Sequence, residues 1–106
     1  MINENAIRIL NQALNKYGAE TQENILIEEM SELTKALLKY RRAGKNNEYN
    51  LRECENNIIE EIADVEICLE YPIIAHSLTR PDFREEIERV KEYKLKRMIK
   101  RMDEEV

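Results

Sequence analysis

Two short acidic segments of matching composition carry the clearest chemistry in this sequence. They read "IEEMSEL" at residues 27–33 and "IEEIADV" at residues 59–65. In each, the second glutamate of a doublet is followed three residues later by another acid, giving the pairs Glu29/Glu32 and Glu61/Asp64. On a helix, residues three apart lie on one face. Carboxylate oxygens on a shared face are the ligands that hard divalent cations prefer.

Helical periodicity predicts that these pairs point inward. On the first segment's helical wheel, Glu29 falls inside the apolar arc, Glu32 lies at its border, and Glu28 points further out. On the second segment, Glu61 falls within the apolar arc and Asp64 lies beside it. The two inward pairs are therefore expected to face each other across two helices.

Four carboxylates at one point need a cation. Burying an uncompensated carboxylate is costly, and several close together cannot all stay ionised. Without imidazole or thiolate in the set, the oxygen donors favour Mg²⁺, with Mn²⁺ as the alternative. The only histidine, His76, is not in a Glu-x-x-His motif, so a di-iron centre or a zinc site is not favoured. The competing interpretation is a solvated acidic surface, because similar pairs such as Asp82/Glu85 occur elsewhere.

Composition predicts an all-α fold in which one domain, residues 1–106, forms a four-helix bundle-like structure. The chain is short, 37% of its residues are charged, and it holds two glycines and two prolines. Apolar spacing predicts helices over 5–17, 21–42, 51 to at least 70, and about 81–102.

Local signals predict where these helices begin and end. Gly18 suits a left-handed helix C-terminus, and Thr21 is a candidate N-cap. Gly44 and the polar run "KNNEYN" are expected to end the second helix, and Asn50 with Glu53 resembles a capping box. Thr79 and Pro81 are expected at the start of the last helix. Pro72 either kinks or ends the third helix, and the sequence leaves both open.

Charge and cysteine content exclude several classes of function. The net charge is -5, so the whole surface is a poor nucleic-acid binder. No apolar run is long enough for a membrane span, and Cys54 and Cys68 make no disulfide framework, so a cytoplasmic location is expected.

The last predicted helix is locally basic. Lys94, Arg97 and Arg101 lie along one line of this helix and could neutralise a triphosphate. Alternatively, these long side chains lie along a packed face or pair with glutamates.

The segments "EEMSEL" and "EEIADV" together resemble the Glu-Glu-x-x-Glu … Glu-x-x-Asp signature of MazG-like nucleoside triphosphate pyrophosphohydrolases. The resemblance extends over about residues 22–101. It implies an all-α pyrophosphatase fold, a homodimer or homotetramer, and hydrolysis of a nucleoside triphosphate to a monophosphate and pyrophosphate. Pro72 departs from the uninterrupted third helix of that family.

Position by position, the resemblance implies functional roles for nine residues. The Mg²⁺ ligands would be Glu29, Glu32, Glu61 and Asp64, and Glu28 would either support these ligands from outside or assist in water activation. The substrate contacts would be Gln22, Lys94, Arg97 and Arg101. The alternative hypothesis is a non-catalytic helical interaction or regulatory module with the same fold.

Overall fold

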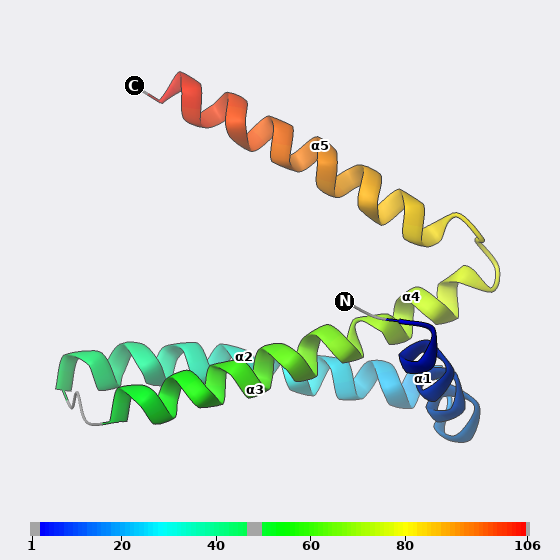
Figure 1. The fold of residues 1–106 in the computed structure, drawn as a ribbon, viewed down its shortest axis with the longest axis horizontal. Helices are drawn as coiled ribbons and strands as arrows, with labels where there is room; N and C mark the ends of the chain where they lie inside the picture. The colour runs from blue at the N-terminus through cyan, green and yellow to red at the C-terminus, as the bar shows by residue number, and fades with distance from the viewer. Residues whose placement is uncertain (1–2, 47–49, 106) are drawn as a thin grey trace. The chain divides into compact units, whose positions relative to one another are not determined.

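A computed structural model describes residues 3–46 and 50–105 of the chain, and those residues form helices and turns without a strand. The helices are α1 (Glu4–Tyr17), α2 (Ala19–Asn46), α3 (Leu51–Cys68), α4 (Glu70–Ser77) and α5 (Phe83–Glu104) (Figure 1). The predicted all-α class is therefore confirmed. The chain divides into two compact units, residues 1–72 and 73–106, and each is described by itself.

The first unit is built on an antiparallel hairpin of α2 and α3, which lie side by side along their length (Figure 1). A repeat of seven residues lines its seam. On α2 the repeat is Gln22, Glu29 and Ala36, and on α3 it is Cys54, Glu61 and Cys68. The outer members of both sets are buried, and Ala36 is only 2% exposed. Residues seven apart lie on the same side of a helix. Each central glutamate therefore lies in the seam, between two buried residues of its own helix.

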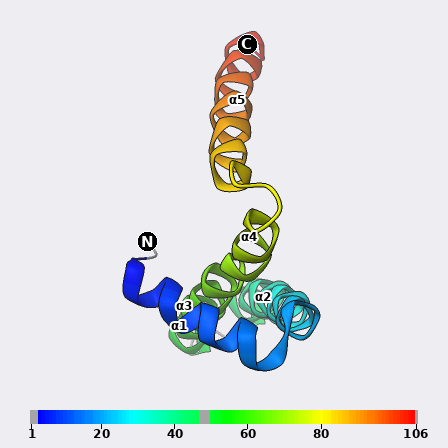
Figure 2. The same ribbon diagram turned by 90° about the vertical axis from the view of Figure 1, so that its right-hand side faces the viewer.

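Helix α1 closes the end of the hairpin where α2 begins. Figure 2, which looks along α2 and α3, shows α1 crossing their ends. The side chain of Asn3 caps α1 by accepting a hydrogen bond of 2.9 Å from the backbone N–H of Ala6. Leu10 is the buried residue of this helix, and with Ala6, Ile9 and Ile67 it lines a small apolar groove.

Gly18 separates α1 from α2, as its position in the sequence predicts. Its backbone N–H donates to the carbonyl of Leu14 at 2.8 Å, and its φ is 90° with ψ at 155°. This combination of positive φ and extended ψ is open to glycine and strained for residues that carry a Cβ.

We expect Gly18→Ala to destabilise the first unit by about 1–3 kcal/mol, because alanine is strained in this conformation. A Cβ placed there would meet no heavy atom within 4 Å, so the backbone alone causes the loss. Chemical denaturation measures it. An unchanged denaturation midpoint would show that residues 17–19 adopt another conformation without cost.

The bounds of α2 correct two predictions. The helix begins at Ala19, so Thr21 lies inside its first turn and is not the N-cap. It also continues through Gly44, which was expected to end it. A single glycine lowers helix stability by only about 1 kcal/mol, so its flanking helix formers can carry the helix past it. Residues 47–49 of the predicted loop lie outside the described residues.

We expect Gly44→Ala to stabilise the protein by up to about 1 kcal/mol, the opposite sign to the change at Gly18. Its added Cβ would lie 3.6 Å from Cδ2 of Leu51, an ordinary van der Waals distance. The same denaturation experiment tests this, and a lower midpoint would contradict the helical placement of residue 44.

The third predicted helix is divided in two, with α3 ending at Cys68 and α4 beginning at Glu70. Pro72 is the third residue of α4. It has no N–H to donate to Cys68, and its ring crowds that carbonyl, so the interruption falls four residues before the proline. Leu69 between the helices keeps helical angles, with φ at -60° and ψ at -23°. The chain is therefore kinked, and "IIAHS" continues as helix.

The predicted caps of the later helices differ from those observed. The side chain of Asn50 makes no capping hydrogen bond, so the expected capping box with Glu53 is not formed. Helix α5 begins at Phe83, two residues later than expected, after a turn in which the N–H of Phe83 donates to the carbonyl of Arg80. Thr79 instead donates from its hydroxyl to the carbonyl of His76 at 3.4 Å. None of the described helices is both long enough and apolar enough to cross a membrane.

Candidate metal centre

Three of the four predicted ligands meet in the seam of the hairpin. One carboxylate oxygen from each of Glu29, Glu61 and Asp64 lies within 4.8 Å of the others. We call these three residues the acidic cluster. All three side chains are half-buried, between the fully solvated and the fully enclosed extremes. Such a set of oxygen donors, drawn from two adjacent helices, is of the type that binds Mg²⁺ or Mn²⁺.

The electrostatics of the acidic cluster are unfavourable when it is empty of cations. Burial and the neighbouring carboxyl groups of Glu61 and Asp64 raise the pKa of Glu29 from 4.5 to about 7. Burial comes first among these causes, followed by a hydrogen bond to Glu61, which requires one of the two carboxyl groups to be protonated. At pH 7, Glu29 is therefore protonated in about half of the molecules, and the protonated share falls as the pH rises.

A buried oxygen of Glu61 is the strongest sign that the cluster is made for a ligand. Its Oε2 is enclosed and lacks a conventional hydrogen-bond donor among the described residues. The proton shared with Glu29 meets this need only when Glu29 is protonated, so at higher pH the oxygen is left without compensation. A divalent cation bound in the cluster would compensate that oxygen when Glu29 is ionised, and the donor set therefore fits the predicted metal.

Glu32 is the predicted ligand that the structure does not bring into the cluster. Its side chain is exposed, and Oε1 accepts from Nζ of Lys35 at 3.4 Å. Exposed pairs of this kind contribute at most about 1 kcal/mol. Glu32 lies one helical turn from Glu29. For all four acids to bind one metal ion, the side chain of Glu32 would have to rotate away from Lys35, at a small cost in free energy.

The other predicted residues of α2 occupy different settings. Glu28 is exposed beside Glu29, in agreement with its outward place on the helical wheel. Gln22 is 4% exposed, and its Oε1 has no hydrogen-bond partner among the described residues. Gln22 stands seven residues before Glu29 on the seam, so an uncompensated amide oxygen lies along the same line as the acids.

Cys68 is a neighbour of the acidic cluster that lies outside the two acidic segments of the sequence. Burial raises the pKa of its thiol, and the charges of Glu29 and Asp64 raise it further. Cys68 follows Asp64 by four residues and Glu61 by seven, and this spacing could have identified it. A thiol held protonated in this way is a packing residue, and the metal-binding set remains one of oxygen atoms.

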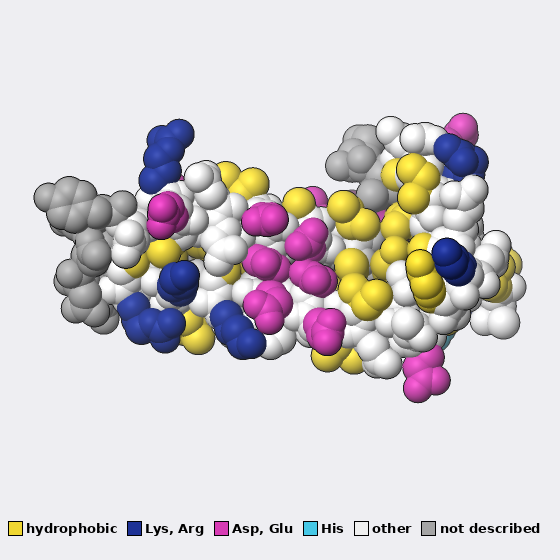
Figure 3. All heavy atoms as spheres, turned by 90° about the horizontal axis from the view of Figure 1, so that it is seen from below, with side chains coloured by type: hydrophobic (Ala, Val, Ile, Leu, Met, Phe, Trp, Pro, Cys, Tyr) yellow, Lys and Arg dark blue, Asp and Glu magenta, His cyan; other side chains and the backbone are white. Residues whose placement is uncertain are grey.

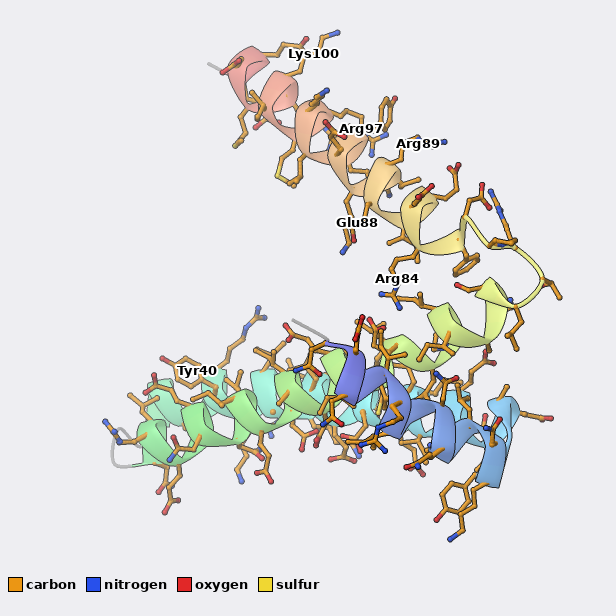
Figure 4. The ribbon with its side chains drawn as sticks, turned by 45° about the vertical axis from the view of Figure 1, so that its right-hand side comes forward. Tyr40, Arg84, Glu88, Arg89, Arg97 and Lys100 are labelled. Atoms are coloured by element: carbon orange, nitrogen blue, oxygen red, sulfur yellow. The ribbon has the colours of Figure 1, made fainter. Side chains whose placement is uncertain are left out.

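The predicted phosphate-binding cations belong to the second unit. Lys94, Arg97 and Arg101 are all exposed on α5. The guanidinium of Arg97 stands over the ring of Tyr93, 5.7 Å from its centroid. Figure 4 shows Arg97 projecting from the same side of α5 as Arg89 and Lys100. The basic side chains of α5 gather in its second half, where residues 94–101 carry five bases and no acid.

The hairpin itself presents an acidic face. Figure 3 shows Asp and Glu side chains gathered along the middle of one face, with Lys and Arg side chains nearer one end. The competing interpretation of a solvated acidic surface describes most of this face. It does not describe Glu61, whose Oε2 is enclosed.

Comparisons of the chain with models of protein families, with curated proteins and with solved structures find no match. The resemblance to MazG-like enzymes therefore rests on the two acidic segments of the sequence.

Proposed function

We propose that the protein is a Mg²⁺-dependent nucleoside triphosphate pyrophosphohydrolase with a MazG-like fold. The observation that carries the proposal is the acidic cluster with its enclosed, uncompensated Glu61 oxygen. An acid pair repeated on consecutive helices and turned into a common seam is the arrangement that a cation with bound phosphates needs.

The residues of the cluster would hold Mg²⁺ through Glu29, Glu61 and Asp64, and Glu32 would join after leaving Lys35. When bound, the cation neutralises phosphate oxygens and lowers the pKa of the attacking water. Glu28, exposed beside the cluster, would accept the proton of that water. The oxygen of that water would bond to one of the two bridged phosphorus atoms as the bond from that atom to the bridging oxygen breaks, giving the monophosphate and pyrophosphate.

The remaining predicted residues would bind the two ends of the nucleotide. Lys94, Arg97 and Arg101 would stabilise the pyrophosphate as charge develops on it. The amide oxygen of Gln22 would accept a hydrogen bond from the nucleoside, which would meet its present lack of a partner.

The proposal includes a homodimer or homotetramer. Large apolar side chains are exposed on every long helix, including Ile27 at 60% and Ile59 at 65%. The buried set is small for a chain of this length, so association would supply a core that the described residues of one copy lack.

The test is incubation of the purified protein with Mg²⁺ and each ribo- and deoxyribonucleoside triphosphate, with products separated by ion exchange. We expect equal amounts of monophosphate and pyrophosphate from at least one substrate. Calorimetric binding of Mn²⁺ without any such product would favour the alternative, a helical interaction module. Absence of both would overturn the metal site as well.

A further inference from the structure

Lys35 is a basic residue of the first unit that contacts a predicted metal ligand. Its Nζ lies 3.4 Å from Oε1 of Glu32, which stands one helical turn earlier on α2. Both side chains are largely exposed, at 70% for Lys35 and 51% for Glu32. Such a pair is weak, because water screens the two charges and both long side chains lose freedom on pairing. Either charge can therefore leave for a stronger partner.

The direction of the Lys35 side chain brings its ammonium toward the acidic cluster. On a helix, long side chains lean toward the N-terminal end, so each covers the turn that precedes it. The contact between Lys35 and Glu32 agrees with this direction. Glu29 lies three residues before Glu32, which is about 4.5 Å along the helix axis. The ammonium of Lys35 thus lies beside the turn of α2 that adjoins the cluster.

The charges around the cluster decide which ligand such an ammonium can bind. The face of the hairpin is acidic, so it repels a nucleotide that carries no metal ion (Figure 3). With Glu32 among the metal ligands, as the proposed function requires, Lys35 loses the contact that it makes in the structure. An ammonium beside phosphate oxygens gains charge-assisted hydrogen bonds, which are stronger than an exposed ion pair. Lysine suits this change of partner because its flexible stem carries three donors.

We propose that Lys35 is a phosphate-binding residue of the metal centre and that it acts by exchanging partners with Glu32. In the structure the two side chains contact each other. When the nucleotide binds with its metal ion, Glu32 turns to the metal ion and Lys35 turns to a phosphate oxygen. This inference rests on the proposed function. It adds a cation from the unit that carries the cluster to Lys94, Arg97 and Arg101, which belong to the second unit.

Partner exchange predicts different effects on metal and nucleotide binding in one variant. Lys35→Gln removes the partner that holds Glu32 away from the cluster. Its affinity for Mn²⁺ alone should therefore not fall, and we expect a rise of up to about 5-fold. Its affinity for a nucleoside triphosphate in the presence of Mn²⁺ should fall about 10–100-fold, because a hydrogen bond between charged groups is lost.

The experiment is calorimetry on the full chain with two successive titrants. The first is Mn²⁺ alone, and the second, at saturating Mn²⁺, is the α,β-methylene analogue of each ribo- and deoxyribonucleoside triphosphate. The methylene bridge prevents the proposed cleavage, so the second titration measures binding without turnover. Lys35→Arg keeps the positive charge and should retain at least about a third of the nucleotide affinity of the unmutated protein.

Lys39→Gln is the matched control for Lys35→Gln. It removes the same charge from an exposed lysine of the same helix, one turn further from the cluster. If Lys35 acts by contact with a phosphate, Lys39→Gln should change the nucleotide affinity less than about 3-fold, since a distant exposed charge is screened. Equal losses in the two variants would show a general effect of charge and would overturn the role of Lys35.

The proposed function and the role of Lys35 fail in different ways. If the unmutated protein binds no analogue in the presence of Mn²⁺, the proposed function is refuted, and the role of Lys35 with it. If the unmutated protein binds an analogue and Lys35→Gln binds it equally well, only the role of Lys35 is overturned. A fall in the Mn²⁺ affinity of Lys35→Gln would also overturn partner exchange, because it would show that the ion pair holds Glu32 in place for the metal ion.

A double-mutant cycle tests the exchange of partners itself. Removing Lys35 should release Glu32 for the metal ion only while residue 32 carries a charge that the lysine can hold. We therefore expect Lys35→Gln to raise the Mn²⁺ affinity in the unmutated background and to raise it less in the Glu32→Gln background. An equal rise in both backgrounds would contradict partner exchange.

Discussion

Glu61→Gln should abolish Mn²⁺ or Mg²⁺ binding and reduce nucleotide hydrolysis at least about 100-fold, because removing even an outer-shell partner of a metal site costs 10–100-fold. The same substitution should raise the melting temperature of the metal-free protein. Glutamine is nearly isosteric and uncharged, so it relieves the repulsion between Glu29, Glu61 and Asp64 and can donate to its neighbours. Loss of binding together with a gain in stability is the signature of residues placed for a ligand and against the fold.

Glu60→Gln is the matched control for this result. Glu60 is the adjacent residue of α3, has the same chemistry and is exposed outside the cluster. It should leave metal binding and activity within about 2-fold, since exposed substitutions usually have small effects. Calorimetry with Mn²⁺, thermal melting without metal, and product analysis are made on both variants. A Glu61→Gln protein that still binds Mn²⁺ with unchanged affinity would refute the metal centre.

The seam was predictable because its signal is periodic. Gln22, Glu29 and Ala36 repeat at seven residues on one helix, and the cysteines flank Glu61 at seven residues on the other. Apolar and small residues set the contact face of each helix, and an acid in phase with them is carried inward whatever its own preference. The wheel positions of Glu29, Glu61 and Asp64 follow from this periodicity alone.

The rotamer of Glu32 was not predictable in the same way. The wheel places it at the border of the apolar arc, where a long side chain can turn inward or toward Lys35. In the structure the side chain of Glu32 points outward, where its carboxylate is exposed and paired with Lys35. Electrostatics favours it, because a fourth carboxylate in the cluster would add to the repulsion that already raises the pKa of Glu29.

Helix boundaries were predicted less well where one residue has two possible uses. Gly44 can end a helix or lie within it at a cost of about 1 kcal/mol, and the structure has it inside α2. Pro72 can end a helix or occupy an early turn of the next one. The structure uses it in α4, where its missing N–H costs little. The sequence therefore identifies the residue that can interrupt a helix, whereas tertiary packing determines at which position the helix ends.

Without added metal, the pH dependence of the melting temperature should report the protonation of Glu29. Its pKa in the folded state, about 7, lies above the ordinary value of 4.5. The folded state therefore holds this proton more tightly than the unfolded state. The resulting stability is fully present below pH 4.5 and is lost as the pH rises through about 7. Glu29→Gln mimics the protonated acid, so it should remove this part of the pH dependence and melt above the unmutated protein at pH 8.

Metal binding should have the opposite pH dependence, because the cation and the proton compete for the same oxygens. Below pH 7, releasing one proton for each ion bound lowers the apparent affinity for Mn²⁺ by about tenfold per pH unit. Above pH 7 the affinity should level off. Calorimetry in buffers of different ionisation enthalpy measures the released proton directly. Glu32→Gln is the control for the melting experiment, because it should leave the pH dependence of the melting temperature without metal unchanged. A Mn²⁺ affinity that is flat between pH 5.5 and 7.5 would mean that the ion binds without displacing the proton of Glu29, and therefore outside the seam.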